Sequence, residues 1–169
     1  VVRAVMLDPR TDRPLGDPVY FNVALAGAAE EQEAPAARLE VRDSGQFVEP
    51  GAPAVVDFAA AAVRFDVGGM HDAGEPSHLR APRPGTYLAV AELAWDERQA
   101  ARGYRSIAVH LRGEPVGSAS GIAVPFAPAA AGQVLVQQAT AIVRMEVDDT
   151  VQLLAQQDAG GITVPIDAA

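Results

Sequence analysis

Apolar and polar residues alternate along much of this chain, in short runs separated by turn-forming residues. The longest run opens at Thr86 and places an apolar or aromatic residue at every second position: Tyr87, Ala89, Ala91, Leu93 and Trp95. A run over residues 105–111 repeats the pattern, with one face formed by Ile107, Val109 and Leu111 and the other by Ser106, Ala108 and His110. A period of two residues predicts strands that bury one face.

Further short runs of the same kind predict additional strands. They cover residues 38–42, 46–48, 55–58, 61–67, 134–136, 140–147, 151–157 and 162–166. Gly, Pro and Asp residues stand between them as turn signals, and residues 96–102, which contain a weak helical pattern, are interpreted as a loop. About eight to ten strands without a convincing amphipathic helix predict an all-β fold, an antiparallel two-sheet jelly-roll sandwich.

The first 35 residues have a different pattern. Asp-Pro and Arg-Pro pairs interrupt them, and residues 26–35 are acidic and rich in Ala, which favours a solvated linker. Within this part, residues 19–25 alternate and are a candidate edge strand. We therefore expect an extended N-terminal arm or linker over residues 1–35 and a jelly-roll domain over residues 36–169.

Composition narrows the classes of function. Nearly half of the residues (49%) are apolar, enough for a substantial core, and the formal net charge is −9. An acidic chain without clustered cations argues against nucleic-acid binding, because phosphate contacts need Lys and Arg. No cysteine is present, which excludes disulfides and thiolate metal sites. No apolar run is long enough to cross a bilayer, so we expect no membrane insertion.

Several short motifs, in order and at consistent spacing, support a family resemblance. They are Phe65 and Asp66; Gly69, Met70, His71 and Asp72; Leu79, Ala81 and Pro82; Gly85, Thr86 and Tyr87; Gly103, Tyr104 and Arg105; Arg112, Gly113 and Glu114; Val147, Asp148, Asp149, Thr150 and Val151; and Gln157, Asp158, Gly160 and Gly161. With them, residues 36–166 resemble the jelly-roll domains of the tumour necrosis factor and complement globular-head superfamily, in its bacterial and bacteriophage branch. The family usually has Gly-Asp at the positions of Asp148 and Asp149, and Asn-Gly at Arg112 and Gly113, but both departures keep a turn former.

The resemblance implies a ten-stranded, two-sheet jelly roll that forms a compact homotrimer. Such domains sit at the end of a stalk or fibre and bind proteins, glycans or other surface ligands. Calcium sites occur in some members of the family, without a fixed set of ligands.

One loop region concentrates residues that could hold a metal. Asp66, His71, Asp72 and Glu75 combine carboxylates, which suit calcium, with an imidazole, which suits zinc. The alternative is a solvated loop in which Asp66 and Asp72 accept hydrogen bonds from nearby backbone amides. We expect no cofactor, with calcium as the open alternative.

Two further groups of side chains are candidates for contacts with other molecules. Trp95, Asp96, Arg102 and Tyr104 surround one loop and could form a ligand-binding platform, although Trp95 could instead cap one end of the core. A candidate trimer interface consists of Tyr87, Glu92, Arg105 and His110. Glu92 either faces solvent, which we favour, or faces a neighbouring subunit and pairs with an arginine.

Catalysis is not expected. The three histidines lack the spacing of a metal-dependent enzyme, and the Gly-Ser-Ala-Ser-Gly stretch at residues 117–121 is not followed by the helix that a serine nucleophile elbow needs. We therefore expect a non-catalytic homotrimeric structural and binding module. Its setting would be a bacteriophage virion, as a tail or head fibre or other surface protein, or an exported bacterial surface protein, hence virion or extracellular.

Three kinds of partner follow from that expectation. They are other copies of the chain, a neighbouring virion or shaft protein contacted through residues 1–35, and a glycan or protein on a host surface. The alternative function is a lectin-like or metal-assisted ligand-binding module.

Overall fold

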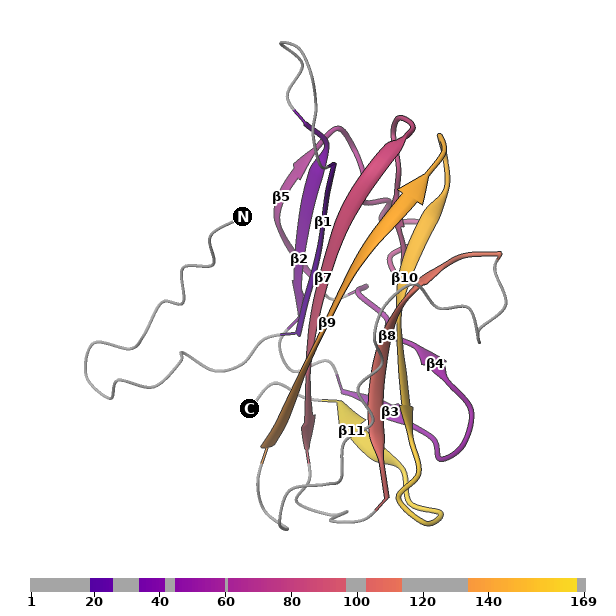
Figure 1. Ribbon diagram of the computed structural model, residues 1–169. Coiled ribbons are helices and arrows are strands. Elements are labelled where there is room, and N and C mark those ends of the chain that lie inside the picture. Colours follow the sequence, from indigo (N-terminus) through magenta and orange to yellow (C-terminus); the bar gives the residue numbers. More distant parts are fainter. Residues whose placement is uncertain are drawn as a thin grey trace, which may run out of the picture.

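The structure is a computed structural model of the 169-residue chain, and all of its regular elements among the described residues are β-strands (Figure 1). It describes residues 19–25, 34–41, 45–59, 61–96, 103–113 and 134–166. The strands are β1 (Val19–Leu25), β2 (Ala36–Val41), β3 (Gln46–Val48), β4 (Ala54–Val55), β5 (Ala62–Val67), β6 (Leu79–Arg80), β7 (Gly85–Asp96), β8 (Arg105–Leu111), β9 (Val134–Met145), β10 (Thr150–Gln157) and β11 (Val164–Ile166). The prediction of an all-β fold is confirmed.

A seven-stranded antiparallel sheet is organised around β7. One edge of β7 pairs with β9 along its whole length, from Gly85 opposite Met145 to Asp96 opposite Val134. Its other edge pairs with β1 and, at Trp95, with β11. From there the sheet continues through β2 to β5 at one end and to β3 at the other.

The second sheet has four strands and is organised around β10 in the same way. β8 pairs with one edge of β10 along seven residue pairs, from Val151 opposite Leu111 to Gln157 opposite Arg105. The other edge pairs with the two short strands β6 and β4. In Figure 1, β8 and β10 form a layer beside β7 and β9, as in a sandwich.

The core lies between the two sheets. The five alternating residues of β7, from Tyr87 to Trp95, are all fully buried, as predicted. Ile107 and Val109 of β8 join them, and so do the inward residues of β10, such as Leu153. The two-residue period therefore identified the core face of these strands correctly.

Two expectations about the strands were wrong. Residues 19–25 form a strand, but β1 lies between β7 and β2 and is paired on both sides, so it is not an edge strand. Alternation reports which face of a strand is buried and not how many neighbours it has. The runs at 134–136 and 140–147 belong to one strand, β9, because Gln137 and Gln138 between them continue the ladder with β7.

The described residues contain no helix long and apolar enough to cross a membrane.

Candidate functional site

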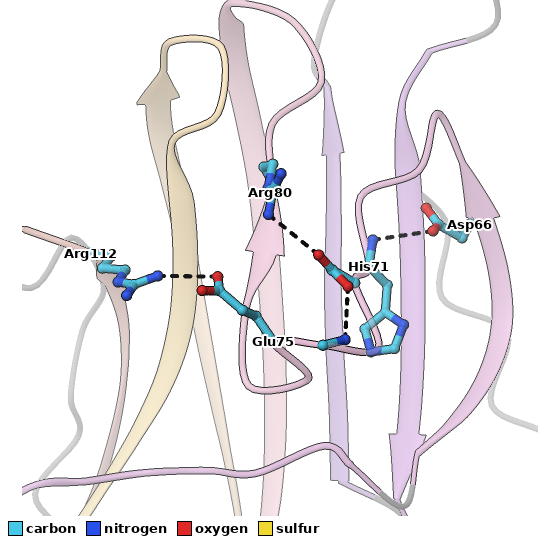
Figure 2. A network of polar contacts seen from close by, with 7 residues as sticks. Asp66, His71, Glu75, Arg80 and Arg112 are labelled. Atoms are coloured by element: carbon cyan, nitrogen blue, oxygen red, sulfur yellow. Dashed lines mark hydrogen bonds and ion pairs between the residues drawn. The ribbon is translucent and has the colours of Figure 1, made fainter.

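A loop between β5 and β6, residues 68–78, carries most of the predicted metal ligands (Figure 2). Asp66 is the penultimate residue of β5, and its carboxylate accepts hydrogen bonds from the backbone N–H groups of Met70, at 2.7 Å, and His71, at 3.1 Å. Gly68 and Gly69 have positive φ angles of 93° and 69°, which let the chain reverse between the strand and these amides. Asp66 therefore closes its own loop.

The other two carboxylates of the loop are directed at different partners. Asp72 accepts a hydrogen bond from the Gly74 amide at 2.8 Å and lies 3.5 Å from the guanidinium of Arg80. Glu75 instead contacts Arg112, with 3.2 Å between Oε2 and Nη1. Figure 2 shows Glu75 facing Arg112, which directly follows β8, with Arg80 of β6 nearby.

The four predicted metal ligands, Asp66, His71, Asp72 and Glu75, do not converge. Among the described residues no group of three or more Asp, Glu, His or Cys side chains is placed to hold a metal ion. The local alternative, with Asp66 and Asp72 bonded to backbone amides, matches the observed hydrogen bonds. A calcium or zinc site at these residues stays a prediction, and it would require the carboxylates to leave their present partners.

A row of polar side chains crosses the outer face of the four-stranded sheet. The amide oxygen of Gln152 accepts a hydrogen bond from His78 Nε2 at 2.9 Å, and its amide nitrogen donates to His110 Nδ1 at 3.1 Å. Gln152 and His110 are directly opposite in the β10–β8 ladder, which accounts for the contact. Alternation predicts the outward face for His110, but it does not identify Gln152 as its partner, because a glutamine in a strand carries no signal of what it contacts.

A second polar cluster is buried at the opposite end of β8 and β10. The indole of Trp95 donates to the side chain of Gln137 at 2.8 Å, and Gln137 donates to the backbone carbonyl of Arg105 at 2.9 Å. The Arg105 guanidinium lies 5.8 Å from the centre of the Trp95 ring, within the range of a cation–π interaction. Both side chains are fully buried.

Gln157 completes this buried end. Its amide nitrogen donates to the carbonyls of Val48, at 2.9 Å, and Ile162, at 2.8 Å, and its oxygen accepts from the Ala159 amide at 2.6 Å. Next to it, the Asp158 amide donates to the Tyr104 carbonyl, and a Cβ on Gly103 would overlap the carbonyl oxygen of Asp158. The glycine thus permits a close approach of two backbone segments.

The structure places one residue of the predicted ligand platform in the core. Trp95 is in the core, as in the alternative in which it caps one end, so its ring is not exposed beside the loop. Tyr104 is half-buried, while Arg102 and the side chain of Asp96 lie outside the described residues. The platform therefore has no aromatic ring from Trp95.

The four residues of the predicted trimer interface are all buried within one chain. Tyr87 and Arg105 are fully buried, and Glu92 and His110 are at most 5% exposed. The expectation that Glu92 faces solvent was wrong: alternation put it on the face opposite the core, but that side of β7 is buried at Glu92 too. A trimer interface formed by these four residues stays a prediction.

Burial also affects one titratable group of the core. The hydroxyl of Tyr87 donates to the carbonyl of Arg83 at 2.7 Å. Burial raises the pKa of the Tyr87 phenol above its ordinary value of 10.0, against a smaller opposing effect of Arg83. The phenol is thus held in its neutral, hydrogen-bonding form.

The polar side chains described above are engaged mainly with one another. The two histidines of the polar row are both occupied by one glutamine amide, and the carboxylates of the loop face amides or guanidinium groups. The Ser-containing stretch at residues 117–121 lies outside the described residues. What the described part offers to another molecule is a set of half-exposed charged groups around the ends of β6, β8 and β10.

A scan against protein-family models and a search of curated proteins gave no match to this chain.

Proposed function

We propose that this chain is a non-catalytic homotrimeric structural and binding module with a jelly-roll fold. Its proposed setting is a bacteriophage virion, as part of a tail or head fibre or another surface protein, or the outside of a bacterial cell as an exported protein. The all-β arrangement of two antiparallel sheets supports the fold, and the resemblance carried by the motifs from Phe65 to Gly161 supports the setting.

The observation that carries the assembly is an apolar surface on the seven-stranded sheet. The outward residues of β9 alternate with its buried ones and include Val136 and Ile142, and Ile142 is 73% exposed. Ile142 is directly opposite Leu88 of β7, whose side chain is also partly exposed. We refer to Val136, Ile142, Leu88 and Val90 as the β7–β9 face; β7 and β9 run side by side in Figure 1.

The occupant proposed for this face is a second copy of the chain. Covering an exposed isoleucine contributes on the order of 1.5–3 kcal/mol, so a few such side chains per copy supply a real driving force. In a closed threefold ring each copy would present the same pair of patches, head to tail. On this face the apolar side chains are interspersed with the exposed polar residues Gln138 and Thr140, and exposed apolar side chains gathered on one face are typical of association sites on soluble proteins.

Multi-angle light scattering over a dilution series tests this proposal. A trimer has about three times the chain mass of 17.6 kDa. Ile142→Glu puts a charge into the β7–β9 face and is expected to give the monomer. Val55→Glu is the matched control, because Val55 is exposed on the other sheet, and it should leave the mass unchanged.

A monomeric wild type at all concentrations would rule out the trimer. A trimer that persists in Ile142→Glu would rule out this face. Repeating the series with a chelator separates the lectin-like or metal-assisted alternative, since a mass that falls only in chelator indicates a metal in the assembly.

A further inference from the structure

A cavity of about 300 Å³ opens at one end of the four-stranded sheet. It is lined by Glu75, Arg80, Arg112, Asp148, Asp149 and Thr150. The topology accounts for this gathering: Thr150 is the first residue of β10, and it is paired with Arg80 of β6 on one side. On the other side its carbonyl accepts a hydrogen bond from the Arg112 amide at 2.8 Å.

The two guanidinium groups of the cavity are held only lightly. Among the described residues, Arg112 pairs with Glu75 at 3.2 Å, and Arg80 lies 3.5 Å from a carboxylate oxygen of Asp72. All four side chains are between 40% and 55% exposed. Ion pairs of this kind contribute little free energy, so an incoming ligand can replace one of their contacts at small cost.

The turn at Asp148 and Asp149 forms one wall of the cavity, and it is held more firmly than the two guanidinium groups. Asp148 has a positive φ of 68° and donates its backbone N–H to the Ala81 carbonyl at 2.9 Å. The Asp149 carbonyl accepts from the Ala81 amide, and its carboxylate accepts from the Glu146 amide at 2.7 Å. The backbone therefore fixes the position from which Asp148 faces the cavity.

Charge and hydrogen-bonding capacity define what such a cavity can accept. Its lining has two guanidinium groups and three carboxylates, a formal charge of −1. Guanidinium groups only donate hydrogen bonds, ionised carboxylates only accept them, and a hydroxyl group does both. A ligand with several hydroxyl groups can satisfy both kinds of lining group, whereas an anion meets an excess of like charge.

We infer that this cavity binds one sugar-sized, hydroxyl-rich unit that carries no anionic group, either neutral or with an ammonium group. The volume lies at the small end of the range for ligand pockets, which suits a single ring better than a chain of them. The ammonium group of an amino sugar would be placed by the carboxylates of Asp148 and Asp149. This inference rests on the proposed role as a binding module and names the class of its ligand.

Three probes with the same ring and different charge test it: glucosamine, glucose and glucose 6-phosphate. Each is titrated into the full 169-residue chain and followed by backbone amide NMR shifts. We expect saturable shifts around Arg80, Arg112 and Thr150, tightest for glucosamine, weaker for glucose and weakest for glucose 6-phosphate. Raised salt should weaken glucosamine binding more than glucose binding, because only the former depends on net charge.

Two variants assign the binding to this cavity. Asp148→Asn and Arg112→Gln each remove one charged partner and should weaken binding about tenfold, which corresponds to the loss of one charge-assisted hydrogen bond. Arg144→Gln is the matched control, because Arg144 is highly exposed on β9 of the other sheet. It should bind all three probes as the wild type does.

Three results would overturn the inference: no saturable shift with any probe, tightest binding of glucose 6-phosphate, or unchanged binding in both cavity variants. The mass of each sample, measured by light scattering, separates this outcome from failure of the proposed assembly. A trimer that binds no probe rejects the ligand class alone, and a monomer that binds glucosamine at the cavity rejects the trimer alone.

Discussion

The two ends of the β8–β10 pair place the same types of side chain in opposite circumstances. At one end Arg105 and Gln157 face each other across the ladder, fully buried, beside Trp95 and Gln137. At the other end Arg112 and Arg80 flank Thr150, half-exposed and in contact with half-exposed carboxylates. Seven residues of strand, roughly 20 Å, separate the two ends.

The difference lies in what replaces water around each polar group. In the buried end the side chains of Trp95, Gln137 and Gln157 replace water with protein hydrogen bonds of 2.6–2.9 Å, so removing one partner leaves another group unsatisfied. At the cavity end water still reaches the charged groups, and losing one contact costs little. We therefore expect the buried end to maintain the fold and the cavity end to be available for ligands.

Replacing Gln157 with methionine is expected to have the largest effect on stability. The change keeps a long side chain but leaves the carbonyls of Val48 and Ile162 and the amide of Ala159 without their partner. We expect the free energy of unfolding to fall by about 3–5 kcal/mol. Urea denaturation followed by Trp95 fluorescence measures it, since this is the one tryptophan of the chain.

Glu49→Met is the control for that variant, because Glu49 is exposed and lies outside the β7–β9 face. Its unfolding free energy should stay within about 0.5 kcal/mol of the wild type. Equal losses in the two variants would contradict the distinction between the buried and the exposed end.

Tyr87→Phe sharpens the comparison, because Tyr87 makes a buried hydrogen bond near the cavity end. Losing the bond to the Arg83 carbonyl should cost about 1 kcal/mol at neutral pH. Because burial raises the pKa of this phenol above 10.0, folding favours its protonated form. Its contribution is complete below pH 10 and is lost as the pH rises through the folded-state pKa.

The wild type should therefore lose stability on the alkaline side of pH 10 more steeply than Tyr87→Phe does. Thermal unfolding between pH 8 and about 11 measures the difference in slope. Tyr104→Phe is the control. It leaves Tyr87 intact, so the contribution of Tyr87 to the slope of stability against pH should be the same as in the wild type. Parallel slopes for the wild type and Tyr87→Phe would show that the phenol is not held neutral by the fold.

Arg112→Gln is expected to have the smallest effect on stability, although it is expected to weaken ligand binding. The ion pair with Glu75 is half-exposed and single, so the free energy of unfolding should change by about 0.5 kcal/mol or less. Glu75→Gln should do the same, and the double variant should show little coupling between the two. A loss above about 2 kcal/mol for either variant would place the cavity end among the elements that maintain the fold.

Several strands and turns of the fold could be predicted from residue patterns. The alternation from Tyr87 to Trp95 identified the core face of β7, and that of residues 105–111 placed Ile107 and Val109 of β8 in the core correctly. The turn at Asp148 and Asp149 was also found, because two Asp residues between apolar runs are a strong turn signal. The short strand β6 was missed, since two residues of strand have no detectable period.

The candidate sites were harder to predict. Asp66, His71, Asp72 and Glu75 are close in sequence, and yet their carboxylates point to different partners. The lining of the cavity combines residues 75, 80, 112 and 148–150, whose proximity depends on β6 and β8 flanking the same strand. Such neighbours are set by strand order, which a local pattern does not contain.

By itself the sequence determined the class of fold, most of the strands and the core face of β7. These properties depend on the side-chain period and on turn chemistry, which are local. Only the tertiary structure decided that β1 is an inner strand, that Glu92 and His110 are covered, and that Arg80, Arg112 and Asp148 share one cavity. These follow from long-range pairing, where residues far apart in the chain become neighbours because two sheets bury a common core.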